Sequence, residues 1–159
     1  MGPVADTWFT VDKDGLSQLM AARPRVAMLH DLLQNVFDED ATTAVVTVAP
    51  IDGRRGRARL VVADDCPDGF ADLRDAFTMY RSSRKKNDPT KRGRFNEGEK
   101  FVLSLCEEAT IATTTGTVHF HADGTRTTSR TSTDVGSVFD AVAKLTRAEV
   151  DAMLTEVRR

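Results

Sequence analysis

Three polar side chains with metal-binding or acid–base chemistry recur at helical spacing in the first quarter of the chain. Asp31, Asn35 and Asp38 are separated by four and then three residues, so on a helix they would share one stripe. The amide oxygen of an Asn can ligate Mg²⁺, and a carboxylate one turn away can orient or deprotonate a water molecule. The same spacing also suits a plain solvated helix face, so these residues alone leave both interpretations open.

A second acidic group follows a stretch that has the character of a buried strand. The sequence RARLVVAD ends at Asp64, and Asp65, Cys66, Pro67 and Asp68 precede Gly69. A carboxylate at a strand end can accept a hydrogen bond from an exocyclic amine such as the 6-amino group of adenine. The alternative interpretation is a strand followed by an Asx-type turn.

The strongest motif is the glycine-containing segment 93–100, GRFNEGEK, which leads directly into an apolar stretch. Glycines ahead of a helix let backbone N–H groups approach phosphate oxygens, and the helix N-terminus adds partial positive charge. Lys100 is long enough to reach a terminal phosphate, and Asn96 tolerates a positive φ. Residues 81–100 carry eight basic and three acidic side chains. A charged, solvated loop with a helix cap is the alternative, and the pattern is neither a Walker A motif nor a dinucleotide fingerprint.

Hydrophobic periodicity and turn residues predict the elements that must position these groups. We expect helices at 16–22, 24–38, 68–79, 98–108 and 147–158, and strands at 7–11, 43–51, 57–64, 110–120, 125–132 and 136–145. Helix 24–38 has one apolar face, made of Leu29, Leu32, Leu33, Val36 and Phe37. The segment DGRRG should close a hairpin, and residues 81–97 should form a long loop. This order favours a single α+β domain over residues 1–159, a two-layer sandwich with a mixed, mostly antiparallel sheet and helices on one face.

Composition excludes several classes of protein. The formal net charge is −2, so nothing draws the whole chain to nucleic acid or to an anionic membrane. We find no stretch long enough to span a bilayer and no signal peptide. Cys66 and Cys106 lack CxxC spacing and are expected to be free thiols, which favours the cytoplasm of a bacterium or of a virus that grows in one. His119 and His121 should share one strand face as surface residues rather than metal ligands.

In this order along the chain, the motifs resemble those of the GHKL (Bergerat-fold) ATPases, the family of gyrase, heat-shock chaperones, histidine kinases and MutL. The family's Glu-Leu-x-x-Asn-x-x-Asp box is matched by Asp31-Leu32-Leu33-Gln34-Asn35-Val36-Phe37-Asp38. The resemblance implies that Asn35 ligates Mg²⁺, that Asp38 belongs to the nucleotide site, and that Asp31 positions the attacking water. Asp31 is one methylene shorter than the usual Glu, which implies slow ATP hydrolysis at most.

The remaining boxes of the family are matched less fully. Asp64 corresponds to the Asp that reads adenine, with Gly69 in the glycine positions that follow, and Ser137 after Gly136 corresponds to a hydroxyl that helps bind adenine. The second glycine box and the lid upstream of it, at about 81–97, would supply further nucleotide-binding residues, namely Ser83, Lys85, Gly93, Phe95, Asn96, Gly98 and Lys100. Several stretches, LLQNVFDED among them, also look like ATP-binding proteins of actinobacteria and their phages.

The resemblance implies that ATP and Mg²⁺ are the ligands of this chain. Its function would be a nucleotide-driven conformational switch, read by a protein partner or a second subunit. A protein kinase or anti-sigma-type phosphotransferase on the same fold is the first alternative. A protein- or DNA-binding module that uses the basic loop without nucleotide chemistry is the weaker alternative, and no membrane partner is expected.

Overall fold

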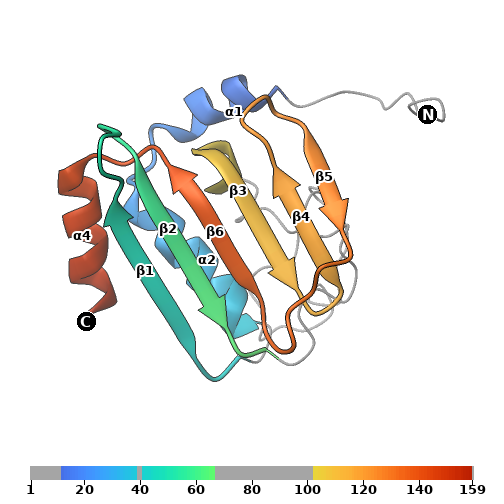
Figure 1. Cartoon of the computed structure of the whole chain (residues 1–159). Coiled ribbons are helices and arrows are strands. Elements are labelled where there is room, and N and C mark those ends of the chain that lie inside the picture. Colours follow the sequence, from blue (N-terminus) through green and yellow to red (C-terminus); the bar gives the residue numbers. More distant parts are fainter. Residues whose placement is uncertain (1–11, 39–40, 67–101, 159) are drawn as a thin grey trace.

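The computed structural model of the chain describes residues 12–38, 41–66 and 102–158. Three helices and six strands lie in these ranges: α1 (Lys13–Met20), α2 (Val26–Asp38), β1 (Ala44–Pro50), β2 (Ala58–Asp64), β3 (Cys106–Thr113), β4 (Gly116–Phe120), β5 (Arg126–Ser129), β6 (Val138–Ala143) and α4 (Arg147–Val157). The strands form one sheet, and α2 lies behind it in Figure 1, with α4 packed against α2 and β1. The expected two-layer α+β sandwich is confirmed.

The sheet has the order β1-β2-β6-β3-β4-β5, and every neighbouring pair is antiparallel. The hairpin of β1 and β2 runs in register from Ala44 opposite Asp64 to Pro50 opposite Ala58. Strand β6 inserts between β2 and β3, although it comes much later in the chain. This insertion puts the start of β6 beside the end of β2, where Ala63 pairs with Val138.

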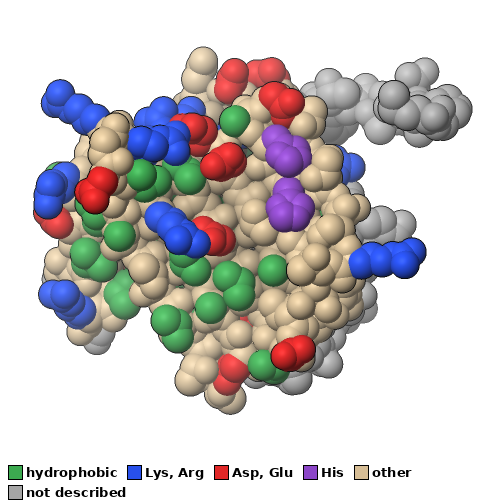
Figure 2. Space-filling view, in the orientation of Figure 1, with side chains coloured by type: hydrophobic (Ala, Val, Ile, Leu, Met, Phe, Trp, Pro, Cys, Tyr) green, Lys and Arg blue, Asp and Glu red, His purple; other side chains and the backbone are tan. Residues whose placement is uncertain are grey.

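The core lies between the sheet and the helices. Alternate residues of the central strands, such as Leu60 and Val62 on β2 and Phe139 on β6, are buried together with Leu29 of α2 and Met153 of α4. The intervening residues face the opposite, open side of the sheet. Figure 2 shows that side, where apolar, charged and histidine side chains are mixed. Of the helices in the described ranges, none has the length and hydropathy that a bilayer-crossing segment needs.

One strand prediction and part of one helix prediction are wrong. The single strand expected at 110–120 is two strands, β3 and β4, joined by a turn at Thr114 and Thr115. The Thr113 hydroxyl accepts a hydrogen bond from the Thr115 amide and donates one to the Gly116 carbonyl, both at 3.1 Å. A side chain therefore closes this turn, and Gly116 adopts φ 146°.

The helix expected at 98–108 does not continue to its predicted end, because residues 106–108 belong to β3. Only residues 102–104 are helical in the described part of that range. Cys106, which we expected on a helix face, is nevertheless buried. Phe37, expected on the apolar face of α2, is 56% exposed. The expected elements at 7–11, 68–79 and 81–97 lie outside the described residues.

Candidate functional site

The side chain of Asp64 is fixed between two strands at one end of the sheet. It continues the alternation of Leu60 and Val62 and therefore faces the helix layer. Its Oδ1 atom accepts hydrogen bonds from the Cys66 amide at 3.0 Å and from the Ser137 amide at 3.1 Å. The first bond is the Asx-type turn that we weighed as the alternative. The second crosses to Ser137, the residue that precedes β6, so the Ser137 amide joins that residue to Asp64. The adenine-binding role that the resemblance implied for the Ser137 hydroxyl stays a prediction.

Gly136 allows this close approach of the two strands. Its φ is +73°, and a Cβ atom there would lie 1.8 Å from the carbonyl oxygen of Asp64. Its amide donates to the Cys66 carbonyl at 3.0 Å, and its carbonyl accepts from the Thr133 hydroxyl at 2.6 Å. Gly136 is buried. Only glycine fits a site that combines a left-handed conformation with this backbone contact.

Asp65, the next residue, has a structural task that the sequence reasoning missed. Its carboxylate accepts hydrogen bonds from the Thr42 hydroxyl, from the Thr42 amide at 2.8 Å and from the Thr43 amide at 3.0 Å. The Thr42 hydroxyl and then the Thr43 amide hold the pKa of Asp65 well below its ordinary value. Asp65 therefore anchors the segment that enters β1, and the only sequence signal for it was the Thr-Thr pair before a strand.

Helix α2 carries Asp31 and Asn35 on the same side of the sheet as the Asp64 side chain (Figure 1). Asp31 and Asn35 are half-buried, so they are not on a fully solvated helix face. Figure 1 shows that α2 runs in the same direction as β2, so that its C-terminal half approaches the sheet end that carries Asp64. Asp38 is the last residue of the helix, and the structure describes no placement for its side chain.

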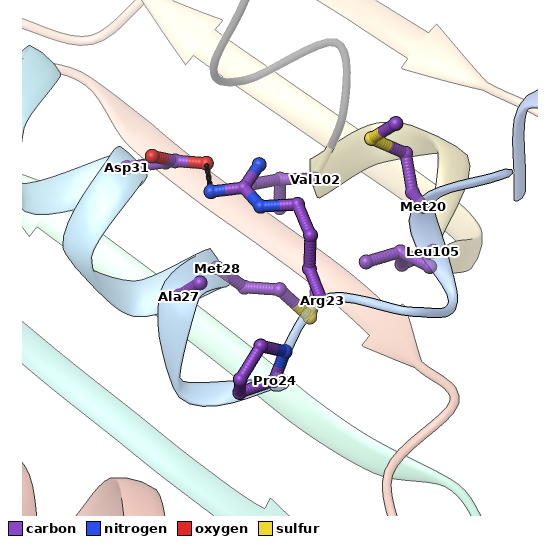
Figure 3. A pocket seen from close by; sticks show the side chains of 8 residues that line it. All are labelled: Met20, Arg23, Pro24, Ala27, Met28, Asp31, Val102 and Leu105. Atoms are coloured by element: carbon purple, nitrogen blue, oxygen red, sulfur yellow. Dashed lines mark ion pairs between the residues drawn. The ribbon is translucent and has the colours of Figure 1, made fainter.

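The carboxylate of Asp31 forms an ion pair that sequence reasoning did not foresee. Arg23, in the connection between α1 and α2, places Nη2 3.1 Å from Oδ2 of Asp31. The two residues line a pocket with apolar side chains that include Met28 and Val102. Figure 3 shows the Arg23 side chain extending past Val102 toward Asp31. The pocket has a volume of about 10 Å³, which is near the minimum for one water molecule.

Four of the predicted site residues with described side chains can be placed: Asp31, Asn35, Asp64 and Ser137. The others, apart from Asp38, lie outside the described residues, namely Gly69, Ser83, Lys85, Gly93, Phe95, Asn96, Gly98 and Lys100. Convergence of the segment 93–100 on Asn35 and Asp64 thus stays a prediction.

The two histidines of the open face make hydrogen bonds to threonines. His119 contacts the Thr110 hydroxyl at 3.4 Å, and His121 contacts the Thr127 hydroxyl at 2.9 Å. Over the described ranges, no three His, Cys, Asp or Glu side chains gather in a way that could hold a metal ion.

Comparison with known proteins gives a similarity of fold only. No family model matches the sequence, and no curated protein matches it. Among solved structures, the chain is similar to one described as the crystal structure of the N terminal domain of a DNA repair protein, with a TM-score of 0.56 and 17% sequence identity. The match covers 91% of this chain but 46% of that one, so the chain spans about half the length of this structural neighbour.

Proposed function

We propose that this chain is a GHKL-type domain that binds Mg-ATP between α2 and the sheet end at Asp64, and that it acts as a nucleotide-dependent conformational switch. The observation that carries this proposal is the anchored carboxylate of Asp64. The amide of Ser137, the residue before β6, and the amide of Cys66, in the Asx-type turn of Asp64, both donate to Oδ1. A carboxylate oriented in this way, on the helix side of the sheet, suits recognition of an exocyclic amine of a base.

Two residues of α2 complete the proposed roles. Asn35 is half-buried on the same helix as Asp31, and its carboxamide oxygen fits the hard, oxygen-only ligand preference of Mg²⁺. A bound Mg²⁺ would neutralise charge on the phosphates. Asp31 would orient the attacking water, and its short side chain supports slow turnover. Cys66 and Cys106 are buried and form no disulfide bond, which favours a reducing compartment such as the bacterial cytoplasm.

Titration calorimetry with Mg²⁺ and a non-hydrolysable ATP analogue tests this proposal. We expect the wild-type protein to bind, Asn35→Ala to lose Mg-dependent binding, and Asp64→Asn to weaken adenine recognition relative to other bases. Asp31→Ala should bind the analogue while losing any release of phosphate. Binding should also raise thermal stability, by about 2.7 kcal/mol at a ligand concentration of 100 times Kd.

The control is Asp140→Asn, which removes a carboxylate from the same sheet but on its open face, where Asp140 pairs with Arg59. This variant should bind the analogue as the wild-type protein does. Unchanged binding in Asn35→Ala and Asp64→Asn would refute the proposed site. Transfer of labelled γ-phosphate to a protein, rather than its release as free phosphate, would instead identify a kinase on this fold.

A further inference from the structure

In the ion pair of Arg23 and Asp31, the Arg23 backbone is held in place while its side chain can change partner. The backbone around Arg23 is held by hydrogen bonds: its amide donates to the Met20 carbonyl at 3.0 Å, and the Ala21 amide donates to the Ser17 carbonyl at 2.9 Å. Pro24 follows directly and limits the backbone further. The position of the Arg23 Cα atom is therefore set, while its long side chain extends over the pocket (Figure 3).

The contact itself can be given up at little cost. The side chain of Arg23 is 41% exposed and that of Asp31 is 21% exposed, and ion pairs open to solvent contribute little to stability. A guanidinium has five N–H donors in a planar fork, and one of its nitrogens makes the contact with Asp31. Phosphate oxygens carry more charge than one carboxylate and match this fork in two-point contacts. Arg23 should therefore prefer a phosphate over Asp31 whenever one is within reach.

The proposed function determines which phosphate that is. An acid that orients the attacking water is separated from the terminal phosphate of ATP by that water alone. If Asp31 has this role, the Arg23 guanidinium, which contacts Asp31 at 3.1 Å, would be nearer to the terminal phosphate than to the two phosphates that ATP shares with ADP. Under the proposed function, the pair would therefore lie where ATP and ADP differ.

We propose that Arg23 distinguishes ATP from ADP: it pairs with Asp31 in the nucleotide-free protein and binds the terminal phosphate when ATP is present, which releases the Asp31 carboxylate for its water. This inference rests on the proposed function, because it assumes that the nucleotide lies against α2. It assigns Arg23 as a phosphate-binding residue, a role that none of the sequence motifs indicated.

Calorimetry in Mg²⁺ with ADP and with a non-hydrolysable ATP analogue tests the assignment. Arg23→Gln should lower the affinity for the ATP analogue about tenfold or more, as expected for loss of a charge-assisted hydrogen bond. The affinity for ADP should not change. Asp31→Asn should raise the affinity for the ATP analogue, because no carboxylate at position 31 then competes for Arg23. The double variant should bind the analogue with the same affinity as Arg23→Gln. The affinity of Arg23→Lys should lie between those of Arg23→Gln and the wild-type protein.

The matched control is the pair of Arg59 and Asp140, a second guanidinium–carboxylate contact that lies on the open face of the sheet. Arg59→Gln and Asp140→Asn should change neither affinity, and circular dichroism would show that each variant is folded. If Arg23→Gln lowered the affinities for ADP and for the analogue equally, or changed neither, the assignment of Arg23 would be wrong. The proposed nucleotide site itself would not be refuted by that result. A wild-type protein that bound neither ligand would refute both proposals together.

Discussion

Replacing Gly136 by alanine should destabilise the domain far more than the same change at another glycine of equal backbone conformation. At position 136 the new Cβ would meet the carbonyl oxygen of Asp64 at 1.8 Å, its carbonyl carbon at 2.7 Å and the Cα of Asp65 at 3.2 Å. All three atoms belong to the backbone, so no side chain can rotate away. The end of β2 and the start of β6 would have to separate.

The chain supplies a matched control for this experiment. Gly53, in the hairpin turn of β1 and β2, has φ +74° against +73° at Gly136, but a Cβ there would meet nothing within 4 Å. Both variants suffer the left-handed strain of a non-glycine residue, about 1 kcal/mol. Only Gly136→Ala adds the clash, and overpacking of this kind costs typically about 1–3 kcal/mol. A contact of 1.8 Å with backbone belongs at the upper end of that range.

Urea and thermal unfolding of the two variants measure the difference. We expect Gly136→Ala to lower the free energy of unfolding by at least about 2 kcal/mol more than Gly53→Ala does. For a domain of this size, the corresponding extra decrease in Tm is about 4–8 °C. Equal losses in the two variants would refute the reasoning, because the close approach of Gly136 to Asp64 would then contribute nothing beyond its φ.

Two further predictions concern titrating groups. The pKa of Asp65 is lower in the folded state than in the unfolded state, so Asp65 stabilises the fold above its unfolded-state pKa of about 4. This stabilisation is lost as the pH falls from that value toward the folded-state pKa. In unfolding experiments, Asp65→Asn should therefore lower the free energy of unfolding at neutral pH and make it less dependent on acid pH, and an unchanged pH profile would contradict the anchoring of Thr42 and Thr43. Burial raises the pKa of the Cys106 thiol to about 12. At pH 8, a thiol reagent should therefore label Cys106 slowly in the folded protein and rapidly in denaturant. Equal labelling rates would show that Cys106 is not enclosed.

The local parts of the fold could be predicted from the sequence because their signals are local. Alternation and the segment DGRRG predicted the hairpin of β1 and β2, and the spacing of apolar residues predicted α2. The break between β3 and β4 was missed because a threonine side chain makes the turn within the run TTTG, without a Pro or an Asn-Gly pair. The strand that follows Leu105 was missed because a short apolar run fits a helix as well as a strand.

The sequence singled out candidate site residues but not the contacts that they make. The motif order singled out Asp64 and Ser137, and the structure brings them together. The placement of β6 between β2 and β3 could not be read from periodicity, because strand pairing over a long separation depends on the whole sheet. Arg23 was missed for a related reason: its ion pair with Asp31 depends on how the connection between α1 and α2 bends back, which no residue pattern specifies.

The position of β6 in the sheet also has a consequence for how the chain folds during synthesis. Ser137, whose amide binds the Asp64 carboxylate, follows Asp64 by 73 residues, so the edge of β2 has no neighbour on that side until β6 has been made. Pairings of such long range raise the contact order and slow folding, and an open strand edge is a site of aggregation in partly folded chains. Nascent chains that stop short of β6 should therefore depend on chaperones more than those that contain it.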